Sequence, residues 1–145
     1  MNARFRLGCR LVLGAVFLVA GGMKLAHPGE FFSDLLGFGV PFPEIFLRLV
    51  AVFLPWLELL AGLGLLVDFW PETIRPVVAA LCLVFVVMLG QAVARGLELN
   101  CGCFGAGGRG WFERPAVALA RAAVLLALAL CVAAVPPIRS RDLSG

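Results

Sequence analysis

Four long apolar stretches restrict the fold of this chain more than any other feature of its sequence. They cover residues 7–26, 46–67, 77–94 and 116–135. Each is close to the about 20 apolar residues that a helix needs to cross a bilayer. The 145 residues are 62% hydrophobic, whereas soluble domains are roughly half apolar, so little chain remains for a water-soluble domain. The sequence predicts an all-α fold, an integral membrane four-helix bundle that forms one domain over residues 1–145.

The first stretch allows a second interpretation as a secretory signal peptide. Three arginines, Arg4, Arg6 and Arg10, precede an apolar run that ends in small residues. We favour a membrane span, because the run is long and continues through Gly21 to Lys24 without an A-x-A-like cleavage site.

The distribution of positive charge predicts the orientation in the membrane. Four spans place both termini on one side, and cytoplasmic segments carry an excess of Lys and Arg. The N-terminal arm, the tail and the second loop carry six arginines: Arg4, Arg6, Arg10, Arg75, Arg139 and Arg141. We therefore expect both termini in the cytoplasm of a multi-pass protein of the cell (inner) membrane, with the segment between the third and fourth spans on the outer face.

The connector at residues 27–45 alternates acidic residues with Phe and Leu before several Gly and Pro residues interrupt the pattern. This spacing predicts a short interfacial helix over residues 30–36, lying on the outer surface. A plain amphipathic connector is an equally good interpretation.

Two cysteines one residue apart, Cys101 and Cys103, are the main candidates for chemistry. They lie in a glycine-rich segment on the predicted outer face, where disulfides persist. A disulfide across so small a ring departs from relaxed geometry, and strained disulfides are the more oxidising ones. Two soft thiolates also suit copper(I), and a structural staple remains open. Zinc or an iron–sulfur cluster normally takes four ligands, so we expect no such metal site.

The other three cysteines, Cys9, Cys82 and Cys131, fall in the predicted cytoplasmic half of the membrane. Buried free cysteines behave as small hydrophobic residues, so core packing is the favoured role for all three. A second redox couple of Cys82 with Cys131 is a minor alternative, because their predicted depths match.

Four polar residues lie inside the predicted spans: Lys24, Glu58, Gln91 and Arg121. Ionisable groups in a bilayer are costly and mark functional sites by default. If these side chains converge, Arg121 and Glu58 could bind a quinone that takes two electrons from the dithiol. The structural alternative is that Glu58 pairs with Arg121, while Lys24 extends to the interface.

Several function classes are excluded. The net charge of +3 is spread over the ends and loops, which argues against nucleic acid binding. The sequence contains no Ser-His-Asp set, P-loop or dinucleotide-binding fingerprint.

Three stretches resemble the MauE family of small membrane proteins, within the wider DoxX-like group. They are "LGAVFLVAGGMKLAHP" at 13–28, "PWLELLAGLGLL" at 55–66 and "CGCFG" at 101–105, in family order across nearly the whole chain. The resemblance implies a four-helix membrane bundle tied to thiol redox. MauE is associated with maturation of the disulfide-rich small subunit of methylamine dehydrogenase, and DoxX-like relatives with sulfur-compound and quinone redox. By position, it implies that Cys101 and Cys103 form the couple and that Glu58 is the intramembrane acid.

The first functional hypothesis is a membrane thiol–disulfide oxidoreductase or relay. Cys101 and Cys103 would exchange disulfides with a thioredoxin-like or disulfide-containing extracytoplasmic protein and pass electrons toward a quinone near Arg121 and Glu58. The alternatives are a copper(I)-binding membrane protein and a non-catalytic assembly subunit whose CGC loop docks another protein.

Overall fold

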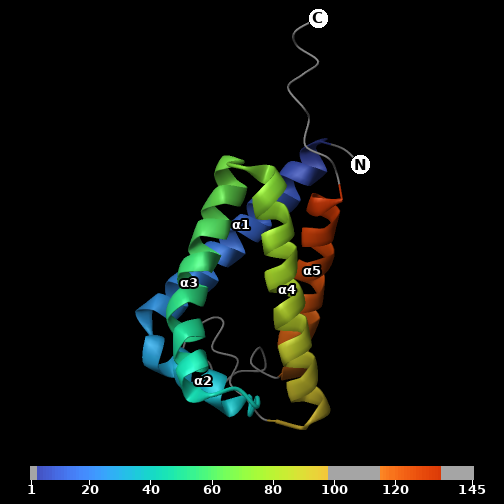
Figure 1. The fold of residues 1–145 in the computed structure, drawn as a ribbon. Coiled ribbons are helices and arrows are strands. Elements are labelled where there is room, and N and C mark those ends of the chain that lie inside the picture. Colours follow the sequence, from blue (N-terminus) through green and yellow to red (C-terminus); the bar gives the residue numbers. More distant parts are fainter. Residues whose placement is uncertain (1–2, 98–114, 135–145) are drawn as a thin grey trace, which may run out of the picture.

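The computed structural model describes residues 3–97 and 115–134, and every regular element in this part of the chain is an α-helix. The helices are α1 (Ala3–Ala26), α2 (Pro28–Gly37), α3 (Glu44–Val67), α4 (Pro71–Ala94) and α5 (Pro115–Ala133). Figure 1 shows α1, α3, α4 and α5 as long rods and α2 as a short helix at one end of the bundle.

The four long helices are apolar and long enough to cross a membrane. Each covers one of the four predicted spans, apart from the last two residues of the fourth. The third predicted span begins at residue 77, whereas α4 begins six residues earlier at Pro71. Proline suits the first turn of a helix, because the N–H that it lacks would have no partner there. Cys82, which is near the start of the predicted span, consequently lies near the middle of α4.

The link between α3 and α4 is short and unusual. Asp68 ends α3 in the left-handed conformation, and Trp70 precedes α4 in the same region of φ/ψ space. The amide of Phe69 donates a hydrogen bond to the carbonyl of Gly64 at 3.0 Å, which closes the last turn of α3. The chain therefore reverses within a few residues and brings α4 back along the bundle.

The bundle is built from two close helix pairs. α1 packs most extensively on α3, and α4 packs most extensively on α5, while α2 lies against α3. The largest core cluster joins residues from all four long helices, including Leu13, Phe17, Leu65, Val78 and Ala129. A second cluster, which includes Phe38, Leu89 and Ala122, lies toward the end of the bundle where α2 is found.

Glycines set the short distance between α1 and α3. A Cβ atom added at Gly62 would lie 2.9 Å from the carbonyl oxygen of Gly14, and one at Gly21 would lie 2.9 Å from the carbonyl oxygen of Pro55. Such contacts are too close for a real side chain, so only glycine permits this approach. Small residues at these positions therefore serve helix packing.

Many large apolar side chains face outward from the long helices. Val52, Phe53, Leu60, Val87 and Val124 are all more than half exposed on the surface of the bundle. In water this would be an unusually large apolar surface, whereas in a bilayer these side chains contact lipid tails.

The start of α1 and the end of α5 lie at one end of the bundle, and α2 lies at the other (Figure 1). α4 ends and α5 begins at the α2 end. We call these the terminal end and the α2 end. A helix is present where the sequence predicts the short interfacial one, and it extends two residues further toward the N-terminus and one toward the C-terminus.

Candidate functional site

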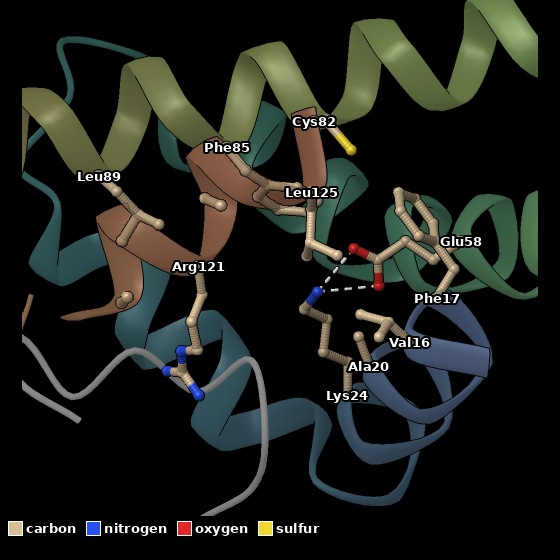
Figure 2. A pocket seen from close by; sticks show the side chains of 12 residues that line it. Val16, Phe17, Ala20, Lys24, Glu58, Cys82, Phe85, Leu89, Arg121 and Leu125 are labelled. Carbon is tan, nitrogen blue, oxygen red and sulfur yellow. Dashed lines mark hydrogen bonds and ion pairs between the residues drawn. The ribbon is translucent and has the colours of Figure 1, made fainter. Parts of the chain in front are cut away.

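A buried ion pair between Lys24 on α1 and Glu58 on α3 forms the centre of the site. The Nζ of Lys24 donates hydrogen bonds to both carboxylate oxygens of Glu58, at 2.6 Å to Oε1 and 2.8 Å to Oε2. Each side chain is only 1% exposed. Figure 2 shows the two side chains facing each other across the space between their helices.

Two aromatic rings complete the surroundings of the Lys24 ammonium. Its Nζ lies 5.2 Å from the ring centroid of Phe31 on α2 and 4.8 Å from that of Phe85 on α4. Cations are attracted to ring faces at such distances, most strongly where water is excluded. Lys24 therefore connects α1 to three other helices at one point.

The helix periodicity explains why both charged residues are buried. On α1, Lys24 continues the buried positions Cys9, Leu13, Phe17 and Gly21 at intervals of three or four residues. On α3, the buried positions at this spacing are Leu47, Ala51, Pro55, Glu58, Ala61 and Leu65. Each charged residue thus occupies a place in the apolar stripe that faces the neighbouring helix.

The expected partner and position of these side chains need correction. The structural alternative paired Glu58 with Arg121 and extended Lys24 to the interface, whereas Lys24 is the cation bonded to Glu58 and is fully buried. Lys24 reaches Glu58 because α1 and α3 approach closely at Gly21, whose missing Cβ would lie 3.2 Å from the Cβ of Glu58.

The ion pair borders a small cavity between α1, α3, α4 and α5. Its volume is about 60 Å³, and Cys82, Phe85 and Arg121 are among the side chains that line it. A cavity of this size holds a few water molecules, each needing about 10–15 Å³. Figure 2 shows Arg121 apart from the ion pair, with its guanidinium directed away from Glu58.

The structure brings together three of the four predicted intramembrane polar residues. Lys24, Glu58 and Arg121 all line the small cavity, whereas Gln91 does not. The amide nitrogen of Gln91 instead donates to the sulfur of Met88, one turn earlier on α4, at 3.5 Å.

The three cysteines within the described residues are free thiols with different surroundings. Cys9 and Cys82 belong to the largest core cluster, which agrees with the expected packing role. Cys131 is exposed on the surface of α5, so the expectation of core packing is wrong for it. The side chain of Cys131 lies on an outward face of α5, which the apolar pattern of that helix did not distinguish from the inward one.

Cys101 and Cys103 lie outside the described residues. Within residues 3–97 and 115–134, no three His, Cys, Asp or Glu side chains are grouped so that they could hold a metal ion.

A second, larger cavity lies beside the first and was not anticipated. It has a volume of about 320 Å³ and shares Phe85 and Leu89 with the small cavity. Side chains of α2, α3 and α4 and of the link between α2 and α3 line it, and five of them are phenylalanines: Phe31, Phe38, Phe42, Phe46 and Phe85. The frequent phenylalanines in residues 27–46 are the sequence feature that could have indicated this cavity. Only the packing of the helices shows that several of these rings line one cavity.

Arg95 is another residue whose role the sequence did not reveal. Its guanidinium donates a hydrogen bond to the carbonyl of Phe38 at 3.1 Å and a longer one to that of Gly39 at 3.4 Å. These bonds join the end of α4 to the segment after α2.

Comparison with known proteins gives one consistent result. The family model described as methylamine utilisation protein MauE matches residues 2–135. The methylamine utilization protein MauE of Paracoccus denitrificans is 35% identical over 127 residues, which cover 86% of this chain and 66% of that protein. The protein of the same name from Methylorubrum extorquens is 35% identical over 82 residues, covering 56% of this chain and 44% of its own length.

The chain thus spans at most about two thirds of the length of these relatives. No solved structure matches it significantly. The family match nevertheless covers nearly the whole chain and includes all four apolar helices. The chain belongs to the MauE family and is a multi-pass protein of the cell (inner) membrane.

Proposed function

We propose that this chain is a membrane thiol–disulfide redox protein. Cys101 and Cys103 exchange a disulfide with an extracytoplasmic protein and pass two electrons to a membrane quinone. One observation carries the proposal: α4 ends and α5 begins at the α2 end, beside the larger cavity. The residues that flank the CGC segment in the sequence are therefore close to a space that suits a ring-shaped apolar molecule.

The reaction has two steps that balance in atoms and electrons. A thiolate of the client attacks the Cys101–Cys103 disulfide and forms a mixed disulfide, which a second client thiol resolves. The client is oxidised, and Cys101 and Cys103 become thiols. The quinone then accepts two electrons and two protons from these thiols, which re-forms the disulfide and yields a quinol.

The larger cavity supports the quinone part of the proposal. Its volume of about 320 Å³ is at the lower end of the range of small-molecule sites, and its walls are almost entirely apolar. Phenylalanine rings favour stacked or edge-on contacts with another ring. The small cavity has too little space for such a ring unless its lining side chains move, so we place the ring in the larger one.

The ion pair lines the small cavity, which is separated from the larger one by side chains that line both. Phe85 lines both cavities and has the Lys24 ammonium over its ring. We propose that Glu58, Lys24 and Arg121, which line the small cavity, stabilise a quinone oxygen while the quinone is reduced. A protonated donor near such an oxygen stabilises the developing negative charge.

The relatives suggest a biological setting. Their names place them in methylamine utilisation. We propose that this chain has an accessory role of the same kind, and that its client is a disulfide-containing or thioredoxin-like protein outside the cytoplasm.

Thiol trapping in intact cells tests the exchange step. We compare the wild type with Cys101→Ser and Cys103→Ser, and with Cys131→Ser as a control for an exposed cysteine outside the couple. A mixed disulfide with another protein in one of the two CGC variants, and its absence in the control, would support exchange. Permanently reduced Cys101 and Cys103 with co-purifying copper would instead show a copper(I)-binding protein. Reduced thiols without metal would leave only a non-catalytic assembly role.

Quinone use has a separate test. The purified protein is reduced, and the rate at which added quinone re-forms the disulfide is measured for Glu58→Gln and Arg121→Gln. Glu44→Gln is the matched control, because Glu44 is an exposed carboxylate on the same helix as Glu58. A slower rate in the first two variants alone supports the proposed site, and equal rates in all of them refute it.

A further inference from the structure

A basic pocket at the terminal end of the bundle is separate from the proposed redox site. Its lining includes Arg6 and Arg10 from the first turns of α1, Asp68 from the end of α3 and Arg75 from the start of α4. Its volume is about 170 Å³. This is far more than the about 10–15 Å³ that one water molecule needs, and it is sufficient for a phosphate group.

The Asp68 carboxylate pairs with two of the three guanidinium groups in this pocket. Arg10 Nη1 lies 2.6 Å from Asp68 Oδ2, and Arg75 Nη2 lies 3.7 Å from Asp68 Oδ1. Three arginines less one aspartate leave two positive charges among the lining residues. Arg6 lines the pocket without an ion pair to any described residue. The lining is therefore complementary to an anion that carries more than one acceptor oxygen.

The pocket also contains a donor that the described residues leave unused. The Nε of Arg10 is buried and has no hydrogen-bond partner among them. A buried donor without a partner costs about 1–3 kcal/mol, and more for a charged group. If the cluster only tied α1 to the link between α3 and α4, the Arg10–Asp68 pair would be enough, and neither Arg6 nor the free donor would be needed.

The position of the pocket indicates which anions reach it. It lies at the ends of helices that span the membrane, where lipid headgroups meet water. Arginine binds phosphate oxygens in forked, charge-assisted pairs, and basic pockets between membrane helices hold anionic headgroups.

We propose that this pocket is a binding site for one phosphate group, supplied by an anionic phospholipid or by free phosphate. Arg6 and Arg10 bind the phosphate oxygens, and Asp68, which pairs with Arg10 and Arg75, competes with the phosphate for Arg10. The site involves no thiol, so it does not depend on the proposed redox function.

The experiment uses the purified full chain in phosphatidylcholine nanodiscs that contain a small fraction of phosphatidylglycerol. Native mass spectrometry counts the lipids that each variant retains. Arg6→Gln should lower the retained phosphatidylglycerol about fivefold, because one arginine near a headgroup contributes about 1 kcal/mol. Arg4→Gln is the matched control, since Arg4 is on the same helix end, is exposed and does not line the pocket.

Asp68→Asn reverses the sign of the expected effect. Asparagine tolerates the left-handed conformation of this position, so the turn is retained. Removing the carboxylate frees Arg10 for the ligand, and retention of phosphatidylglycerol should rise. A role limited to holding the helices together predicts no such increase.

A second arm separates the two sources of phosphate. Inorganic phosphate is titrated into nanodiscs of phosphatidylcholine alone, and the thermal midpoint is followed. If only phosphatidylglycerol binds, the source is the lipid, and if inorganic phosphate stabilises the wild type but not Arg6→Gln, the source is free phosphate. The proposal is overturned if neither probe distinguishes Arg6→Gln from Arg4→Gln.

Discussion

Lys24 and Glu58 are bonded through both carboxylate oxygens, at 2.6 and 2.8 Å, although 34 residues separate them in the chain. They come from the two helices that pack most closely, and both replace apolar residues in the stripes that join those helices. The pair therefore has a structural role, whatever its part in quinone chemistry.

Removing one partner of the pair should destabilise the protein more than removing both. Lys24→Met leaves the Glu58 carboxylate buried and unpaired, which typically costs about 3–5 kcal/mol. The double variant Lys24→Met/Glu58→Leu has no buried charge and should recover most of that loss. Thermal unfolding in detergent measures both. Equal destabilisation by the single and double variants would mean that the buried charge is not what matters.

Two adjacent glycines should respond in opposite directions to alanine. In Gly21→Ala the new Cβ would lie 2.9 Å from the carbonyl oxygen of Pro55, so α1 and α3 must separate, at a cost of about 1–3 kcal/mol. At Gly22 nothing lies within 4 Å, and Gly22→Ala should gain up to about 1 kcal/mol of helix propensity. Thermal midpoints in one detergent compare them. Similar shifts for both variants would contradict the close contact of the two helices.

Thiol accessibility should differ among the cysteines of the long helices. In a Cys101→Ser/Cys103→Ser background, N-ethylmaleimide should modify Cys131 first, because it is exposed, and Cys9 and Cys82 later, because they are 6% and 2% exposed. Labelling of a buried thiol requires local opening, and even ~1.4 kcal/mol of opening free energy slows it tenfold. Peptide mass spectrometry over time reports the three rates. Equal rates would show that the core around Cys82 is not closed.

Arg95 should hold the segment after α2 in place. Arg95→Gln removes the hydrogen bonds to the carbonyls of Phe38 and Gly39, and a hydrogen bond to a charged group contributes about 1.5–3 kcal/mol. Limited proteolysis should then cut faster between residues 38 and 43. Arg48→Gln is the control, because the Arg48–Glu44 pair is exposed and contributes only about 0.5 kcal/mol. If both variants are cut at the same rate, the two hydrogen bonds do not restrain this segment.

The sequence alone was sufficient for the fold class and for the family. Apolar runs of spanning length have few alternatives to membrane helices, because backbone groups in lipid must bond within their own helix. The prolines and glycines at residues 37–43 also showed where α2 ends, since these residues interrupt helices locally. Such features depend on near neighbours in the chain, and a sequence displays them directly.

Only the tertiary structure decided which polar residues meet. The structural alternative placed Lys24 at the interface and Arg121 beside Glu58. The close approach of α1 and α3 instead brings Lys24 within hydrogen-bond distance of Glu58. The five phenylalanines of the larger cavity and the Arg6–Arg10–Asp68–Arg75 pocket likewise come from different helices. The apolar pattern shows that a helix has a buried face, but the packing distance and rotation of each pair determine which side chains touch across it. Those quantities depend on the interdigitation of side chains from distant parts of the chain, which no single helix encodes.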